Sequence, residues 1–246
     1  AAPGRELDGG AIGGLPLLYP QELDLLPREE VRRTIFAIYE NLFPEGLFLQ
    51  AVIHSGYNVY LSVQVAQCMF RLGEVGKARR ILKEVLRRRS ELWTYPEALH
   101  PRSGGGVMGD GYHGWAFAEI LLLLREFVLH RRGHDVHIFR GMRARELMDA
   151  DLEFGPFPMD GANASIRGRL GRSSGELTVD LPGWANTGAV FLELHLPPRL
   201  RLDEKARLKI DGGRLLHVAG DAGDDREATL RVEVAAGSES VRLQYS

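Results

Sequence analysis

The hydrophobic period of this chain changes near residue 150, and that change constrains its fold more than any other feature. Before it, apolar residues recur at the three- and four-residue spacing of a helix face. After it, short alternating runs are separated by Gly, Pro, Asp and Ser, a pattern typical of strands joined by turns. We therefore expect a two-part α+β protein, with a helical domain over 1–150 and an antiparallel β-sandwich domain over 151–246.

Four long helices are predicted in the first part. They cover 27–42, 58–72, 74–89 and 115–129, and the second and third meet at Gly73 as a helical hairpin. Seven strands are predicted in the second part. They cover 165–170, 175–180, 190–195, 207–210, 214–218, 229–234 and 241–245.

Charge and cysteine content exclude several classes of protein. The net charge of −2 and the pI of about 6.5 argue against a nucleic-acid partner. Cys68 is the single cysteine of 246 residues, so an internal disulfide and a cysteine-rich zinc site are excluded. The longest apolar run, Ile120–Leu124, is far shorter than a membrane span. With no signal peptide recognised at the N-terminus, we expect a cytoplasmic protein without a membrane partner.

Sequence motifs for the common cofactors are missing. The sequence contains no P-loop, dinucleotide fingerprint, HExxH or GxSxG motif. His130 and His134 have the spacing of a helical metal pair, but Gly133 between them indicates that the helix has already ended. We therefore expect no cofactor and no metal site.

The segment from Thr94 to Gly114 is the best candidate for a functional site. It is about twenty residues long with no predicted element, and segments of this kind inside a compact domain are usually functional or disordered. Its carboxylates are Glu97 and Asp110, and its rings, with the flanking tryptophans, are Trp93, Tyr95, His100, Tyr112, His113 and Trp115. Rings stack on sugars and carboxylates hold hydroxyls or move protons, so a sugar site is one interpretation. The other is that both carboxylates only cap helices and fix the loop. The residues alone leave both open.

Four segments resemble a known family. They are Asp8–Gly14 (DGGAIGG), Ile53–Ser62 (IHSGYNVYLS), Thr94–Gly106 (TYPEALHPRSGGG) and Met108–Glu119 (MGDGYHGWAFAE). Together they resemble the C-terminal part of bacterial six-hairpin glycosidases, the (α/α)6-toroid enzymes of the glycogen-debranching and glucoamylase type. The resemblance covers about residues 8 to 130, and the β part is similar to the small sandwich that often follows such a toroid.

The resemblance implies half of a toroid, because such enzymes have about twelve helices and about five are expected here. It implies an inverting glycoside hydrolase whose general base is Glu97, with Asp110 as second choice, and whose general acid is supplied by an upstream half. The substrate would be an oligosaccharide or glycoside. The resemblance implies that the rings named above bind the sugar, together with His54, Tyr57 and Asn58. An isolated half without the acid would not hydrolyse glycosides by itself.

An incomplete ring also leaves apolar helix faces open. Phe36, Phe70, Leu121 and Leu124 are the expected exposed residues, and either a homodimer or an N-terminal partner half would cover them. Two alternatives to an enzyme remain open: a non-catalytic carbohydrate-binding module and a helical interaction module.

Overall fold

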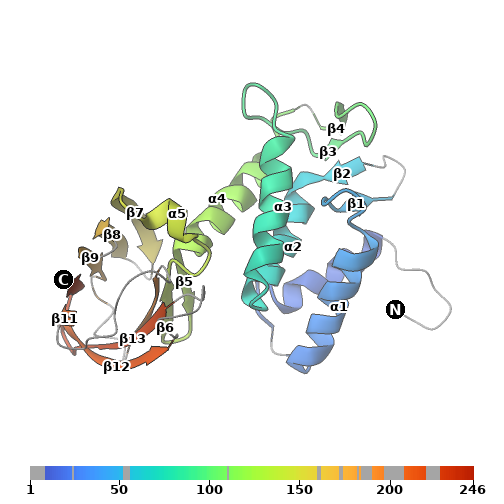
Figure 1. Ribbon diagram of the computed structural model, residues 1–246. Coiled ribbons are helices and arrows are strands. Elements are labelled where there is room, and N and C mark those ends of the chain that lie inside the picture. Colours follow the sequence, from blue (N-terminus) through green and yellow to red (C-terminus); the bar gives the residue numbers. More distant parts are fainter. Residues whose placement is uncertain are drawn as a thin grey trace. The chain divides into compact units, whose positions relative to one another are not determined.

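The computed structural model describes residues 9–23, 25–51, 56–109, 111–159, 162–171, 174–181, 183, 190–196, 208–219 and 228–246. The chain divides into two compact units, Ala1–Leu124 and Arg125–Ser246. The first is built mainly from helices and the second mainly from strands (Figure 1). The predicted two-part α+β class is therefore confirmed.

The helices lie where the apolar periodicity predicted them. They are α1 (Arg28–Asn41), α2 (Val59–Arg71), α3 (Val75–Arg87) and α4 (Gly114–Val128), and the 3₁₀ helix η1 (Gly9–Leu17) precedes them. α4 begins in the first unit, and its residues from Arg125 onward belong to the second. Asn58 starts α2, since its side-chain oxygen accepts a hydrogen bond from the backbone N–H of Leu61 at 3.0 Å.

The first unit has a helical core around α2. Ten of the thirteen residues of α2 are buried, which agrees with a helix covered on more than one side. Phe70 is fully buried, so its predicted exposure is wrong. Phe36 lies beneath the cations of Arg32 and Lys77, at 4.3 and 4.8 Å from its ring centroid. Leu121 and Leu124 are exposed, as predicted.

A small antiparallel sheet lies at one end of α2 and α3 (Figure 1). Its strands, in spatial order, are β1 (Leu49–Gln50), β2 (Gly56–Asn58), β3 (Ala98–Leu99) and β4 (Gly106–Met108). β3 and β4 lie within the segment for which no element was predicted. Strands of two or three residues are too short to show an alternating pattern, so periodicity could not reveal them.

The second unit contains two five-stranded sheets and the short helix α5 (Ala144–Leu147). One sheet has the order β12 (Gly213–Ala219), β13 (Ala228–Val234), β10 (Phe191–Leu196), β6 (Asp135–Ile138), β5 (Leu129–Arg132). The other has the order β11 (Leu208–Asp211), β14 (Ser240–Tyr245), β9 (Gly175–Asp180), β8 (Ala162–Leu170), β7 (Asp151–Met159). Alternate residues of both sheets, such as Leu192 and Leu194 of β10 and Val241 and Leu243 of β14, belong to one apolar core.

Three strands of this unit, β5, β6 and β7, come before the first predicted strand. β5 and β6 form a hairpin directly after α4, with the turn residue Gly133 at φ +59°. β6 then pairs in parallel with β10, whereas the other strand pairs among the described residues are antiparallel. All seven strands predicted after residue 164 are present within one to three residues at each end. The assignment of 1–150 and 151–246 to two functional domains stays a prediction.

No helix in the described part of the chain is both long enough and apolar enough to cross a membrane.

Candidate functional site

The predicted site segments meet in the first unit, across the small sheet. Tyr57 of β2 pairs with Leu99 of β3, and Asn58 pairs with Ala98. The loop from Thr94 to Gly114 therefore lies against the start of α2. His54 and Asp110, two of the predicted site residues, lie outside the described residues.

Glu97 is half-buried and directly precedes β3. Its backbone packs closely on Gly109: a Cβ atom there would lie 3.0 Å from the backbone nitrogen of Glu97, and Gly109 has φ +78°. A side chain at 109 would be strained for both reasons. The glycine thus allows the two arms of the loop to approach each other, and their approach sets the position of Glu97.

A cluster of three rings lies beside Glu97. Its members are Tyr60, His113 and Trp115, and we call it the ring cluster. The ring centroids are 5.2 Å apart for Tyr60 and His113, 5.3 Å for Tyr60 and Trp115, and 5.7 Å for His113 and Trp115. Burial raises the pKa of the Tyr60 hydroxyl, and so do the neighbouring carboxylates of Glu97 and Glu119. Tyr60 is therefore within electrostatic reach of two carboxylates.

Glu119 is the second carboxylate of this region. It lies one helical turn after Trp115 on α4, where residues four apart share a face. Its side chain is nearly buried and accepts hydrogen bonds from the Tyr19 hydroxyl at 2.7 Å and from Gln64 Nε2 at 2.9 Å. Tyr19, which follows η1, and Gln64 of α2 therefore hold the Glu119 carboxylate in place near Tyr60.

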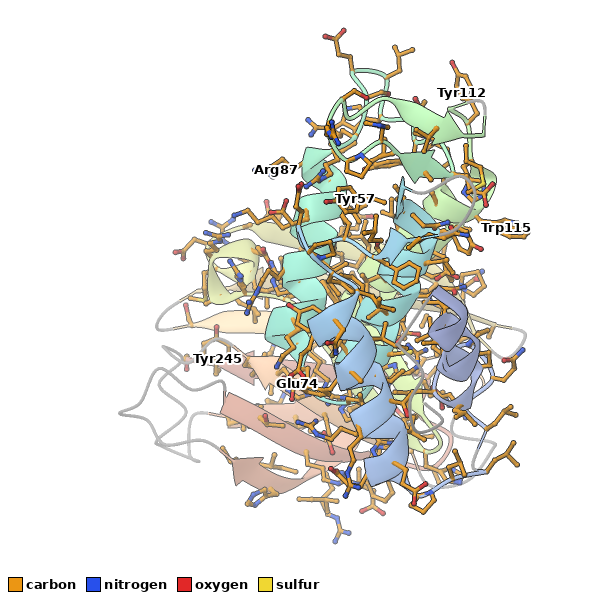
Figure 2. All side chains as sticks on the ribbon, turned by 90° about the vertical axis from the view of Figure 1, so that its right-hand side faces the viewer. Tyr57, Glu74, Arg87, Tyr112, Trp115 and Tyr245 are labelled. Carbon is orange, nitrogen blue, oxygen red and sulfur yellow. The ribbon has the colours of Figure 1, made fainter. Side chains whose placement is uncertain are left out.

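Some of the ring side chains remain open to ligands. Trp115 is 64% exposed and Tyr112 is 66% exposed. Figure 2 shows Trp115 projecting outward from the start of α4, with Tyr112 on the segment that precedes it. Exposed rings beside a half-buried carboxylate are suited to stacking against a sugar ring.

Three predicted binding residues have structural contacts. Tyr57 is buried under the Arg88 guanidinium, 4.9 Å from its ring centroid; burial, with a hydrogen bond to Glu45, raises its pKa. Asn58 is buried as the N-cap of α2. Tyr95 is buried and donates a hydrogen bond to the Val85 carbonyl at 3.2 Å. Sugar binding by these three stays a prediction.

Trp93 and His100 also have contacts within this region. The Arg89 guanidinium stacks over the exposed ring of Trp93, 4.0 Å from its centroid. His100 Nδ1 accepts hydrogen bonds from the backbone N–H groups of Arg102 and Ser103, which shapes the local turn. A pocket of about 410 Å³ lies between the end of α3 and this loop; its lining is Arg88, Arg89, Ser90, Thr94, Pro96, Leu99, Gly104–Gly106, Gly109 and Gly111.

Sequence reasoning did not place Tyr60, Gln64 or Glu119 among the site residues. Tyr60 and Gln64 are four residues apart on α2, and Trp115 and Glu119 are four apart on α4. This spacing places each pair on one helix face, but only the packing of the two helices shows that the two faces meet. The available signal was the four-residue spacing of Tyr60 and Gln64, and of Trp115 and Glu119, on otherwise apolar helices.

Replacing Tyr19 by phenylalanine is expected to lower the free energy of unfolding by about 1.5 to 3 kcal/mol, because it removes a hydrogen bond to a buried carboxylate. Tyr39→Phe on α1 is the matched control, since its hydroxyl lies outside this network and its loss should change stability by less than about 0.5 kcal/mol. Urea unfolding of both variants measures the difference. Equal stabilities would show that the Tyr19–Glu119 contact contributes little.

Comparisons with known proteins give a local sequence similarity and several structural likenesses. No protein-family model matches the chain. A trehalase of Mycobacterium tuberculosis (strain ATCC 25618 / H37Rv) is 32% identical over 102 residues, a match that covers 38% of this chain and 15% of the trehalase.

Two of the solved structures that resemble this chain are α-L-rhamnosidases. The enzyme of Streptomyces avermitilis, complexed with L-rhamnose, has 16% identity and a TM-score of 0.47; the match covers 96% of this chain and 21% of that chain. The enzyme of Dictyoglumus thermophilum has 12% identity and a TM-score of 0.41, covering 96% and 25%. This chain therefore spans a quarter or less of each of these three proteins.

Proposed function

We propose that this chain is the C-terminal half of an inverting (α/α)6-toroid glycoside hydrolase, followed by a β-sandwich, and that it supplies the general base and sugar-binding rings. The observation that carries the proposal is the position of Glu97 beside the ring cluster of Tyr60, His113 and Trp115. The local similarity to a trehalase supports the same class of chemistry.

The proposed chemistry follows from what inversion needs. One carboxylic acid protonates the leaving oxygen while a carboxylate on the opposite face of the sugar removes a proton from water. Glu97 is the proposed base, with Asp110 as the second candidate. The acid would come from the upstream half of the toroid, since the two groups must lie about 6.5 to 9.5 Å apart on opposite sides of the bond that breaks.

The rings have a separate role from the carboxylate. A sugar presents an apolar face of C–H groups, and an aromatic side chain buries that face while the hydroxyls stay free to form hydrogen bonds. Trp115 is the proposed stacking platform because it is 64% exposed and also contacts Tyr60 and His113. His113 is held in place through its backbone N–H, which donates to the Tyr95 carbonyl at 2.9 Å.

Replacing Trp115 by alanine is expected to weaken oligosaccharide binding by about tenfold, the loss of roughly 1.4 kcal/mol of stacking. The measurement is calorimetric titration of the chain with a panel of neutral oligosaccharides. Leu121→Ala is the matched control, since Leu121 is a similarly exposed apolar residue of α4 at 66% exposure. Equal affinity of the Trp115 variant and the unaltered chain would remove Trp115 from the sugar site.

A second candidate function is an interaction module without catalysis. It is favoured by the exposed leucines of α4 in the first unit, Leu121, Leu122 and Leu124, which are 66%, 40% and 42% exposed. An apolar stripe of this kind marks a partner surface, either the missing toroid half or a second copy of the chain. Sugar binding by the isolated chain separates the two functions, because a pure interaction module has no reason to bind oligosaccharides.

A further inference from the structure

We propose that His137, Glu193 and His195, on the outer face of a sheet in the second unit, form a binding site for a divalent transition metal, with Zn²⁺ as the natural candidate. This site is separate from the proposed sugar site and does not depend on it. The three side chains offer two imidazole nitrogens and one carboxylate oxygen that all lie within 4.8 Å of one another. Two histidines and one carboxylate are a known ligand set for Zn²⁺ and for other divalent metals.

Sheet pairing brings the three residues together. His137 on β6 is directly opposite Glu193 on β10, and His195 follows Glu193 by two residues, so all three point to the same face. The neighbours of opposite orientation, Val136 and Leu194, point into the apolar core. Because the sheet fixes the backbone on both sides, the ligand atoms are held close together without a loop having to fold around the ion.

The separation of the two histidine nitrogens agrees with a tetrahedral metal centre. Two nitrogens bound to Zn²⁺ at 2.0 to 2.1 Å lie about 3.3 to 3.4 Å apart in tetrahedral geometry. His137 Nδ1 and His195 Nε2 are separated by 3.4 Å. Glu193 Oε2 is 2.9 Å from His137 Nδ1, so about 0.4 Å of side-chain movement would bring the carboxylate to the same spacing.

Neighbouring groups orient the ligands. The Arg231 guanidinium binds Glu193 Oε1 and, at 2.8 Å, Asp135 Oδ1, which leaves Glu193 Oε2 directed toward His137. The His130 ring stacks on His137 with centroids 5.7 Å apart. Second-layer contacts of this kind commonly fix the rotamers of metal ligands. Arg140 and Arg231 are the nearby cations, and they oppose the binding of a positive ion.

A bound ion would tie together segments that are distant in the sequence. His137 and His195 are 58 residues apart, and they join the β5–β6 hairpin to the rest of its sheet across the parallel β6–β10 pair. Closing so long a loop costs chain entropy, so an ion that binds only the folded site would stabilise this sheet.

The test is calorimetric titration with Zn²⁺ of the full chain and of the variants His195→Gln and Glu193→Gln. His217→Gln is the control, because His217 is exposed on β12 of the same sheet. We expect one Zn²⁺ per chain, and at a hundredfold excess over Kd a rise in Tm of roughly 5 to 10 °C. Each of the first two variants should bind Zn²⁺ at least about 10- to 100-fold more weakly, whereas His217→Gln should bind normally.

A second measurement uses the unaltered chain, so that a variant that fails to fold does not decide the matter. Long-range ¹H–¹⁵N spectra identify the ligating nitrogens, which should be Nδ1 of His137 and Nε2 of His195. The competing account is a purely hydrogen-bonded network, in which His137 Nδ1–H donates to Glu193 Oε2. No saturable binding at micromolar Zn²⁺, binding that is unchanged in His195→Gln, or shifts confined to other histidines would overturn the metal site.

Discussion

Replacing Glu97 by glutamine is expected to reduce glycoside hydrolysis by about 10²- to 10⁴-fold or more, measured on a protein that also contains the upstream toroid half. Glutamine keeps the shape and the hydrogen-bonding reach of glutamate but cannot accept a proton from water. Oligosaccharide affinity should stay within a few-fold of the original value, because the stacking rings are unchanged. The measurement is kcat from initial rates, paired with Kd from calorimetry on the same samples.

Three comparisons make this result specific. Glu91→Gln removes an exposed carboxylate shortly before the site loop and should leave kcat unchanged. Asp110→Asn should affect binding and stability more than kcat if Asp110 only positions the loop. The isolated 246-residue chain should show little hydrolysis, because a single carboxylate cannot both protonate the leaving oxygen and activate water on the opposite face. Full activity of Glu97→Gln would exclude Glu97 as the base. Rapid hydrolysis by the isolated chain would disprove the proposal that the general acid comes from the upstream half.

Replacing Phe70 by alanine is expected to lower the free energy of unfolding by about 3 to 5 kcal/mol, one of the largest effects for a single residue of the first unit. Phe70 is fully buried on α2, so the substitution removes the transfer free energy of the ring and leaves a cavity. Denaturant unfolding followed by circular dichroism measures the change.

Leu121→Ala is the matched control for this variant. Leu121 is 66% exposed on α4, so little apolar surface is re-exposed when it is shortened, and its cost should be below about 0.5 kcal/mol. A loss below about 1 kcal/mol for Phe70→Ala would mean that the α2 region is loosely packed.

The distribution of apolar residues along the chain was sufficient to predict the larger elements. α1 to α4 are each more than ten residues long and have an apolar stripe along their length. β8 to β14 have alternating runs bounded by turn residues. These patterns are local, because a helix or strand that covers one core must place its apolar side chains at its own repeat.

What the sequence did not reveal depends on contacts between distant segments. β3 and β4 are too short for a period, and β5 follows α4 without a break that a pattern could mark. Tyr60 becomes a neighbour of Glu97 and Glu119 only when α2, α4 and the site loop pack together.

The same holds for His137 and His195, which the search for metal ligands at helical spacing does not single out. Residue types and periods are properties of short segments and can be read from the sequence. The pairing of β6 with β10 and the packing of α2 with α4 bring together side chains that are tens of residues apart. Such pairings depend on the free energy of the whole packed arrangement, so only the tertiary structure decided them.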